Sequence, residues 1–343
     1  MTLYKIAELA GTSIGTVDRV LHNRGRVSAA TRARVEAIIE KYHFTPNPIA
    51  KRLKRNRPYR FFALIPRRYQ DAGYWKQIIT GIERAAREIK HIGVETEIIE
   101  FDRYKEGSFK KASALIIAGK PDGLLFPPIM PGLTRAFIEK INAEKIPLVF
   151  VDSDLPGTTP LCAIRQDPFS GGYLAGRLFH LFTGSVSTPA AILDVHCEDY
   201  HITRRKDGFL QYATEHNFPV IVKEYSSLDD TEISVKEISQ FLGEHTELSG
   251  LFITNCMAHK AAEASMERRQ KDSTFLIVGY DLIPENRRLL LEGRIDAIIS
   301  QRPEEQGREA LLTLFQSVVL GQLVESRREI PLDVYIRENT PPI

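Results

Sequence analysis

The chain has 343 residues and a formal net charge of +2, with 43% hydrophobic and 26% charged residues. This composition is typical of a folded protein of two or three domains, and it argues against a disordered chain, a collagen-like repeat and a disulfide scaffold. The charge is uneven, because residues 1–60 contain 13 Lys and Arg against 4 Asp and Glu, whereas the rest of the chain is acidic. A basic head on an acidic body predicts that the head binds a polyanion and the body does not.

No stretch of the chain approaches the roughly 18 uncharged apolar residues that a membrane span needs. Glu8 lies where a signal peptide would have its apolar core, so we do not expect secretion. Cys162, Cys197 and Cys256 are far apart and match neither a metal-binding nor a disulfide spacing, which fits a reducing compartment. We therefore expect a cytoplasmic protein that contacts no membrane and holds no metal.

The first sixty residues are expected to form helices and no strands. Apolar residues recur with helical spacing around Ile6 and again around Val17, and a third helix is predicted after Ser28, a favourable N-cap. Gly11 allows the left-handed turn that joins two helices at a sharp angle. Ala7, Gly11 and Val17 have the spacing of a helix-turn-helix, and the basic charge favours DNA as its ligand. A helical bundle with no nucleic-acid role is the alternative.

From Phe61 onwards, short apolar runs alternate with amphipathic helical stretches, which predicts βαβ units and parallel strands. Strands are predicted at 61–65, 96–101, 123–126, 147–151, 190–195, 220–225, 250–254, 275–278 and 297–300. Helices are predicted at 76–90, 107–118, 132–144, 169–182, 204–216, 231–244, 257–270, 284–292 and 303–320. This number of βαβ units is better accommodated by two sheets of similar size than by one. The expected fold is an all-α head and an α/β core with two doubly wound parallel sheets.

Three segments near the N-terminus carry a family resemblance: LYKIAELAGTSIGTVDRVL, RVSAATRARV and FTPNPIAKRLK. With this spacing, the chain resembles the lactose/galactose repressor family of transcriptional regulators, at lower specificity as far as about residue 337. The resemblance implies that residues 14–22 lie in the major groove of double-stranded DNA, with Arg19 reading guanine. A surface salt bridge is the alternative role of Arg19. The further implied DNA-contacting or capping residues are Thr2, Ser13, Ile14, Gly15, Thr16, Ser28 and Thr31.

Two residues of the expected recognition helix depart from the family pattern. Asp18 stands where serine is usual, and a carboxylate near phosphates is repelled unless it accepts a hydrogen bond, for example from cytosine N4. His22 replaces a common asparagine. Asp18 therefore stays a predicted base contact, while the operator sequence cannot be transferred from relatives.

The segment PNPIAKRLK matches the family's hinge helix, which is too short and basic to be stable alone. The resemblance implies that it orders when two subunits meet over the minor groove. Leu53 would wedge into the central base step, Ala50 would let the paired helices approach, and Asn47 is the third expected DNA contact of the segment. Without the preceding motifs, Leu53 would be interpreted as an exposed linker residue.

The body resembles periplasmic sugar-binding proteins, as the core of the family does. This implies two lobes that face each other across a cleft, with ligand bound beyond the carboxyl ends of the strands. Polar residues suited to sugar hydroxyls follow predicted strands at Asp152, Asn255, Asp281 and Gln301. Arg205 stands in the family pattern R-x-x-G-F after another strand. For the two aspartates, capping of a loop is the alternative role.

Tyr74 and Trp75 follow the first strand of the body, where the family places aromatic residues. Their rings can cover the apolar face of a sugar, and packing in the cleft wall is the alternative. A cluster of side chains able to bind metal follows a later strand: His196, Cys197, Glu198, Asp199 and His201. Its spacing fits no zinc motif, so we interpret it as lining the effector pocket, with His201 as the effector contact.

The sequence contains no dinucleotide-binding G-x-G-x-x-G, no phosphate-binding loop and no G-x-S-x-G. We therefore expect no enzyme and no cofactor. The predicted function is a repressor whose affinity for a pseudo-palindromic operator is controlled by a small sugar or sugar derivative. Two other interpretations stay open: a sugar-binding protein whose head no longer reads DNA, and a carbohydrate-active enzyme on a two-lobed fold.

The expected domains are a helix-turn-helix at 1–45, a hinge helix and linker at 46–58, and an effector-binding and dimerisation domain at 59–343. Within the last domain we expect a lobe near the DNA and a far lobe, with chain crossovers near Cys162, Glu292 and Glu325. The near lobe would comprise 61–161 plus 293–322, and the far lobe 163–291 plus 325–338. The segment after the last predicted strand at 333–336 has no heptads, so we expect a homodimer rather than a tetramer.

Overall fold

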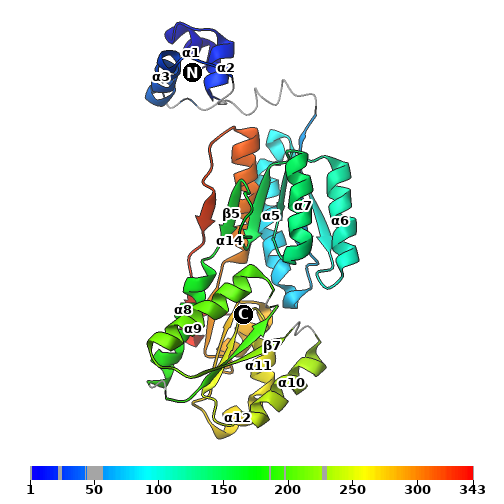
Figure 1. The fold of residues 1–343 in the computed structure, drawn as a ribbon, viewed down its shortest axis with the longest axis vertical. Helices are drawn as coiled ribbons and strands as arrows, with labels where there is room; N and C mark the ends of the chain where they lie inside the picture. Colours follow the sequence, from blue (N-terminus) through cyan, green and yellow to red (C-terminus); the bar gives the residue numbers. More distant parts are fainter. Residues whose placement is uncertain are drawn as a thin grey trace.

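The computed structural model describes residues 2–21, 25–42, 44, 57–184, 187–196, 198–225 and 230–342. A head of three helices is followed by a two-lobed α/β body, which confirms the predicted fold class (Figure 1). The expected DNA contacts Asn47, Ala50 and Leu53 lie outside the described residues, as do His22 and Cys197. No helix in the described part of the chain is long and apolar enough to cross a membrane.

The head consists of α1 (Leu3–Leu9), α2 (Ile14–Leu21) and α3 (Ala29–Lys41). Its small core takes buried apolar side chains from all three helices: Ile6, Ala7, Ala10, Val17, Val20 and Val35. Gly11 joins α1 to α2 with a φ of +59°. A residue with a Cβ adopts this conformation only at a cost, so the turn depends on glycine, as predicted.

The near lobe is built on a parallel sheet with the strand order β11-β5-β4-β3-β1-β2. Its strands are β1 (Tyr59–Pro66), β2 (Val94–Phe101), β3 (Gly123–Phe126), β4 (Leu148–Asp152), β5 (Cys162–Arg165) and β11 (Arg327–Glu329). Its helices are α5 (Tyr74–Ile89), α6 (Glu106–Gly119), α7 (Pro131–Ala143) and α14 (Pro303–Leu314), which ends in a π-helical turn, Phe315–Val319. The strands β3 and β4 are buried along their whole length, as expected where helices cover both faces of a parallel sheet.

The far lobe has the strand order β12-β10-β9-β8-β6-β7, in which only β12 is antiparallel to its neighbour. Its strands are β6 (Ala190–Val195), β7 (Val220–Tyr225), β8 (Gly250–Ile253), β9 (Leu276–Tyr280), β10 (Ala297–Ser300) and β12 (Asp333–Tyr335). Its helices are α8 (Pro168–Thr183), α9 (Tyr200–Glu215), α10 (Thr231–Glu244), α11 (Ala258–Ala264), α12 (Met266–Lys271) and α13 (Pro284–Leu291). The single helix predicted at 257–270 is thus two helices. They meet at Ser265, whose hydroxyl donates to the Ala261 carbonyl at 2.7 Å and so favours a bend.

The expected positions of the three crossovers between the lobes are wrong. Strands β5 and β11 belong to the near sheet and β10 to the far sheet, so the chain crosses at 166–167, 301–302 and 330–332. The predicted crossovers near Cys162, Glu292 and Glu325 come four to nine residues too early. The physical reason is that β11 is fully exposed and polar, and that the apolar pattern of β10 does not say which sheet it joins.

One buried side chain joins the three crossovers. The Nε2 atom of Gln166, in the first crossover, donates to the carbonyl of Ser300 at 3.0 Å and to that of Pro331 at 3.3 Å. Ser300 is the last residue of β10, directly before the second crossover, and Pro331 lies in the third. The three segments therefore form one hydrogen-bonded hinge between the lobes.

Candidate functional site

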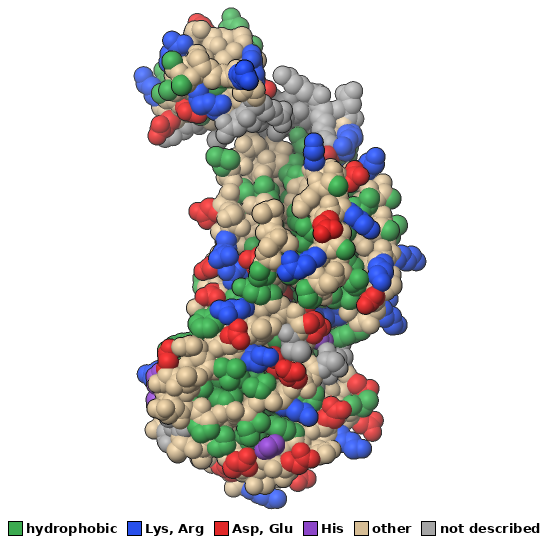
Figure 2. Space-filling model, viewed as in Figure 1, with side chains coloured by type: hydrophobic (Ala, Val, Ile, Leu, Met, Phe, Trp, Pro, Cys, Tyr) green, Lys and Arg blue, Asp and Glu red, His purple; other side chains and the backbone are tan. Residues whose placement is uncertain are grey.

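The second helix of the head presents its predicted DNA contacts on an exposed face. Ile14, Gly15, Asp18 and Arg19 are exposed, and Ile14 keeps 45% of its surface accessible, whereas Val17 packs in the core. Figure 2 shows Lys and Arg side chains spread over the surface of the head. The helix therefore has one face that holds the head together and another that is free to meet a polyanion.

Hydroxyl side chains begin all three head helices. In each case the hydroxyl oxygen accepts a hydrogen bond, 3.2 Å long, from the backbone N–H three residues later: Thr2 from Lys5, Ser13 from Thr16, and Ser28 from Thr31. These positions were predicted as phosphate-contacting or capping, and the structure shows the capping. The N-terminus of a helix also attracts anions, so capping leaves a phosphate contact open.

Arg19 is folded back along its own helix. Its Nε donates to the carbonyl of Gly15 at 3.0 Å, and its Nη2 lies 3.5 Å from Thr16 Oγ1. Among the described residues it forms no ion pair, so the surface salt bridge that was its alternative role is not formed there. Its role as a guanine reader stays a prediction.

Between the lobes, the structure brings together every residue predicted to contact the effector. One pocket is lined by Tyr74, Trp75, Asp152, His201, Arg205, Asn255, Asp281 and Gln301. It is also lined by His196 and Asp199, which were predicted to line it, and by four residues that were not predicted: Asp71, Arg103, Ile202 and Cys256. The pocket lies at the carboxyl ends of the strands of both sheets, where doubly wound folds bind ligands. The contacts of the eight predicted residues with a ligand stay predictions.

The two lobes are closed over this pocket. The volume of the cavity is only about 20 Å³, which is room for one or two water molecules. Pockets that hold small organic ligands usually have volumes of roughly 300–1,000 Å³. The lobes must therefore separate at the hinge before a sugar-sized molecule can enter.

The backbone is strained at several places around the pocket. Asp71, Ala72, Asp152, His196 and Asp281 all have φ values between +49° and +73°. This region of φ costs a residue with a Cβ of the order of 1–3 kcal/mol, and such strain is concentrated at binding and catalytic sites. Its concentration here supports a binding role for the pocket rather than simple loop packing.

A buried ion triad in the pocket joins the two lobes. Arg103, which follows β2 in the near lobe, pairs through Nη1 with Asp71 and through Nη2 with Asp199 Oδ2 of the far lobe at 2.7 Å. The other oxygen of Asp199 accepts the backbone N–H of Met130 at 3.0 Å. Burial would raise the pKa of Asp71, but Arg103 and His196 outweigh it and hold that pKa well below its usual range. We call Asp71, Arg103 and Asp199 the inter-lobe triad.

Arg205 is held in place by a close helix crossing. A Cβ at Gly172 of α8 would overlap the backbone carbonyl of Arg205, and one at Gly208 would overlap the backbone of Phe169. The packing of α8 on α9 thus explains Gly172, Gly176 and Gly208, whereas a Cβ at Gly171 would meet the Tyr280 hydroxyl of β9. The Arg205 guanidinium lies 3.7 Å from the centre of the Tyr280 ring.

The hydrogen bonds of Arg205 go to neutral groups. Its Nη1 donates to the Thr254 carbonyl at 2.8 Å and its Nη2 to Gln301 Oε1 at 3.1 Å, while its buried Nε has no partner in the described part of the chain. A buried donor without a partner is destabilising, and a ligand that accepts a hydrogen bond would satisfy it.

Asp152 of the near lobe and Asp281 of the far lobe are both almost fully buried. Asp152 Oδ1 accepts the Tyr74 hydroxyl at 2.5 Å, and Asp281 Oδ1 accepts Gln301 Nε2 at 3.1 Å. Burial raises the pKa of Asp152 to about 6 and that of Asp281 to about 7, although Arg205 opposes both shifts. These two carboxyls are thus poorly stabilised as anions by the protein alone.

Tyr74 and Trp75 are buried and fixed by their polar atoms. Trp75 Nε1 donates to Asp71 Oδ2 at 2.6 Å, and the Tyr74 hydroxyl is bound by Asp152. The two rings meet edge to face, with centroids 5.1 Å apart. They are part of the cleft wall, and they also line the pocket, so stacking on a sugar stays a prediction.

Three residues of the histidine-rich cluster after β6 line the pocket, namely His196, Asp199 and His201, whereas Glu198 does not, contrary to the prediction. His201 Nδ1 lies 3.1 Å from Ser153 Oγ of the other lobe, and burial and Arg205 lower the pKa of His201 well below its usual value. His196 Nε2 is buried 3.7 Å from Asp71 Oδ1. Glu198 is exposed. Within the described ranges, no group of three or more His, Cys, Asp or Glu side chains is arranged to hold a metal ion.

Arg103, Asp71 and Cys256 are the pocket residues that sequence reasoning missed most clearly. Arg103 comes two residues after the end of β2, so the rule that identified Asp152 at a strand end would also have identified it. Cys256 Sγ donates to the backbone carbonyl of Asp71 across the cleft at 3.2 Å. A contact between two distant loops leaves no spacing signal in the sequence.

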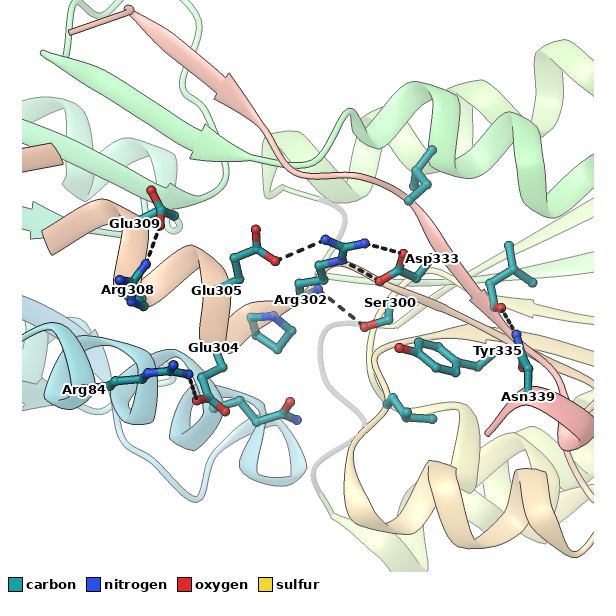
Figure 3. Close-up of a pocket in the computed structure, with 15 residues that line it drawn as sticks. Arg84, Ser300, Arg302, Glu304, Glu305, Arg308, Glu309, Asp333, Tyr335 and Asn339 are labelled. Atoms are coloured by element: carbon teal, nitrogen blue, oxygen red, sulfur yellow. Dashed lines mark hydrogen bonds and ion pairs between the residues drawn. The ribbon is translucent and has the colours of Figure 1, made fainter. Parts of the chain in front are cut away.

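A second hollow, of about 960 Å³, lies beside the crossover segments (Figure 3). Its arginines are paired with carboxylates: Arg302 with Asp333 and Glu305, Arg84 with Glu304, and Arg308 with Glu309. The closest of these pairs joins Arg302 Nε, in the second crossover, to Asp333 Oδ2, at the start of β12, at 2.6 Å. We interpret the ion pairs around this hollow as stabilising the hinge between the lobes.

Comparisons with known proteins agree with the division into a head and a two-lobed body. Residues 2–47 match the family of bacterial regulatory proteins called lacI, and residues 62–322 match the periplasmic binding protein domain. The transcriptional regulator DegA of Bacillus subtilis is 26% identical, over 100% of this chain and 98% of its own. The ribose operon repressor of Bacillus subtilis is 24% identical, over 99% and 98%. The crystal structure of GanP, a glucose-galactose binding protein from Geobacillus stearothermophilus, shares the fold, with a TM-score of 0.74 and 24% identity over 84% of this chain and 100% of that one.

Proposed function

Since the chain belongs to the lacI family of bacterial regulatory proteins, with a periplasmic binding protein domain as its body, we propose that it is a sugar-responsive transcriptional repressor. The observation that carries this proposal is the pocket between the lobes. Eight residues chosen from the sequence as sugar contacts all line it, on a chain that begins with a helix-turn-helix. Relatives that match over nearly the whole chain include an operon repressor for a sugar, which supports the same conclusion.

On the DNA side, we propose a homodimer that reads the two halves of a pseudo-palindrome with two copies of α2. The apolar side chains Leu115 of α6, Val222 of β7 and Ile233 of α10 are exposed, by 54%, 39% and 56%. The helices α6 and α10 lie on the same side of the long axis (Figure 1). Exposed apolar residues on both lobes favour a surface that a second copy would cover.

On the effector side, the pocket supplies both acceptors and donors for hydroxyl groups. The carboxyls of Asp152 and Asp281 accept hydrogen bonds, whereas Arg205 and Asn255 donate them. Asp152 belongs to the near lobe and the other three to the far lobe, so a bound sugar would touch both. We propose that this contact stabilises the closed arrangement of the lobes.

We propose that closure of the lobes is how the ligand controls DNA binding. A change at the hinge would shift the near lobes of a dimer against each other and so alter how the two heads meet the operator. Coupling of this kind typically amounts to about 1–3 kcal/mol between two sites, or roughly a 5- to 150-fold change in affinity. We also propose that no reaction takes place in the cleft. The protein would act in the cytoplasm, where the DNA lies.

The test is a selection of genomic DNA fragments by the full-length protein, followed by operator binding with and without sugars. We expect specific fragments with a pseudo-palindrome, a change in their affinity with at least one sugar, and recovery of that sugar unchanged. Sugar binding with no specific DNA would indicate a sugar-binding protein with an inactive head. Consumption of the sugar would indicate an enzyme, and either result would overturn the proposal.

A further inference from the structure

The pocket between the lobes has two parts that differ in how their charges are paired. In the inter-lobe triad, the carboxylates of Asp71 and Asp199 share Arg103, with the Nη1 and Nη2 atoms each bonded to one of them. Both aspartates also receive further hydrogen bonds, Asp199 from a backbone N–H and Asp71 from the Trp75 indole. This part of the pocket is satisfied within the protein.

The other part of the pocket has two carboxyls, Asp152 and Asp281, and one guanidinium, that of Arg205. Within the described residues, Arg205 forms no ion pair with either carboxyl, because its terminal nitrogens are bound to Thr254 and Gln301. His201 Nε2 lies 3.8 Å from Asp152 Oδ2, beyond hydrogen-bond distance, and burial keeps this imidazole neutral near pH 7 by lowering its pKa. No cation in the described part of the chain is therefore in direct contact with either carboxyl, although the nearby Arg205 guanidinium lowers the pKa of both against the larger effect of burial.

We propose that the effector is a sugar that carries a protonated amino group, and that this ammonium group binds between Asp152 and Asp281. The inference rests on the proposed function, since it assumes that a sugar binds in this cleft. An ammonium group has three N–H donors, enough for both carboxylates and one further acceptor. A hydroxyl group could donate only one hydrogen bond there and would bring no charge.

The position of the two carboxyls connects this charge to the movement of the lobes. Asp152 ends β4 of the near lobe and Asp281 follows β9 of the far lobe, so two anions oppose each other across the hinge. Asp152 is one of the groups that raise the pKa of Asp281, after burial, which is the largest cause. Like charges that approach on closure repel, and a cation between them turns this repulsion into attraction. The ammonium group would thus favour the closed form directly.

The experiment compares matched sugars on the full-length protein at pH 7.5, by calorimetric titration. The pairs are D-glucosamine and D-glucose, D-galactosamine and D-galactose, and D-mannosamine and D-mannose, with N-acetyl-D-glucosamine as a neutral amide. We expect at least one amino sugar to bind at least about ten-fold more tightly than its hydroxyl counterpart, because charge-assisted hydrogen bonds are the stronger ones. Repeating the titration in buffers of different ionisation enthalpy gives the net number of protons exchanged, and the natural protein should release more protons, or take up fewer, than Asp281→Asn, because Asp281 completes its ionisation on binding.

Variants separate a contact with the ammonium from a general effect of charge. Asp281→Asn and Asp152→Asn should each reduce the preference for the amino sugar to about two-fold or less. Glu198→Gln is the matched control, because it removes the same charge from an exposed residue that does not line the pocket, and it should keep the full preference. Circular dichroism and melting of each variant check that it is folded.

The outcomes distinguish this inference from the proposed function. Tighter binding of a neutral sugar than of its amino counterpart would overturn the inference and leave a sugar-responsive regulator. Equal loss of preference in Glu198→Gln would overturn the placement of the ammonium between Asp152 and Asp281. If none of these sugars binds while operator DNA does, both the inference and the sugar response would be overturned.

Discussion

The head and the cleft both depend on charged side chains, but they keep them in opposite surroundings. In the head, Asp18 and Arg19 are exposed around a small apolar core, whereas in the cleft Asp152, Asp199 and Asp281 each expose 3% or less of their surface. Exposed charges act weakly one by one, over distances set by salt. Buried charges need specific partners, and loss of one partner is costly. The head is thus suited to a repetitive polyanion, and the cleft to one small molecule in one geometry.

The largest effect should follow from breaking the inter-lobe triad. Arg103→Met leaves Asp71 and Asp199 buried without their shared cation, which typically costs about 3–5 kcal/mol. We expect a clearly lower melting temperature of the body and weaker effector binding, because the triad joins the two lobes. Arg19→Met, in the exposed part of the head, should change the melting temperature little. Similar melting of both variants would mean that the triad is relaxed in solution and that the contrast between head and cleft fails.

Asp281→Ala should separate the two regions by function. Loss of this buried carboxyl leaves the Gln301 amide, and the hydroxyls of a bound sugar, without their acceptor, at a cost of about 1–3 kcal/mol or more. If the effector releases the repressor, the variant should bind operator DNA and stop responding to effector. If the effector is required for binding, the variant should fail to bind operator at any effector concentration. A variant that binds and responds like the natural protein would mean that Asp281 only caps its loop.

Arg19→Ala tests the head in the same way. Loss of a guanine contact should cost about 1–3 kcal/mol in operator affinity and relax specificity at one base pair in each half-site. Effector binding should be unchanged, because the cleft residues lie in a separate domain with its own core. Titration of operator variants and of random DNA at several salt concentrations measures both quantities. Equal losses on operator and random DNA would assign Arg19 to a phosphate instead.

Much of the fold follows from the sequence because burial in parallel sheets leaves a strong pattern. Strands such as 123–126 and 190–195 are apolar apart from Asp194 in the second, and the structure places them at the predicted bounds. The strand Arg327–Glu329 was missed because it is an exposed edge strand with three charged side chains. The crossovers were misplaced for a related reason, since short parallel strands of both sheets look alike in sequence.

The residues that line the cleft could largely be predicted from the sequence, but the contacts among them could not. One rule, a polar residue after a buried strand, identified Asp152 and Asn255 without any alignment. It could not show that Arg103 reaches Asp199 of the other lobe, because that pair is 96 residues apart and depends on how the lobes close. Nor could it show which carboxyls lack a cation in direct contact, since this depends on the hydrogen bonds of Arg205.

The smallest predicted effect concerns the pH dependence of stability in the absence of effector. The pKa of Asp281 is about 7 in the folded protein, raised mainly by burial, against about 3.9 for an unfolded chain. The folded state therefore binds more protons than the unfolded state between these values, and its stability falls as the pH rises. Between pH 6 and 8 a single carboxyl of this kind accounts for about 1 kcal/mol. In Asp281→Asn this loss should be absent, so the variant should gain in melting temperature relative to the natural protein as the pH increases from 6 to 8.

Asp18→Asn in the head is the matched control, because it removes an exposed carboxylate and should shift the melting temperature equally at both pH values. A gain for Asp281→Asn that did not grow with pH would mean that this carboxyl is already ionised at pH 6. The cleft would then stabilise its charges as well as water stabilises those of the head.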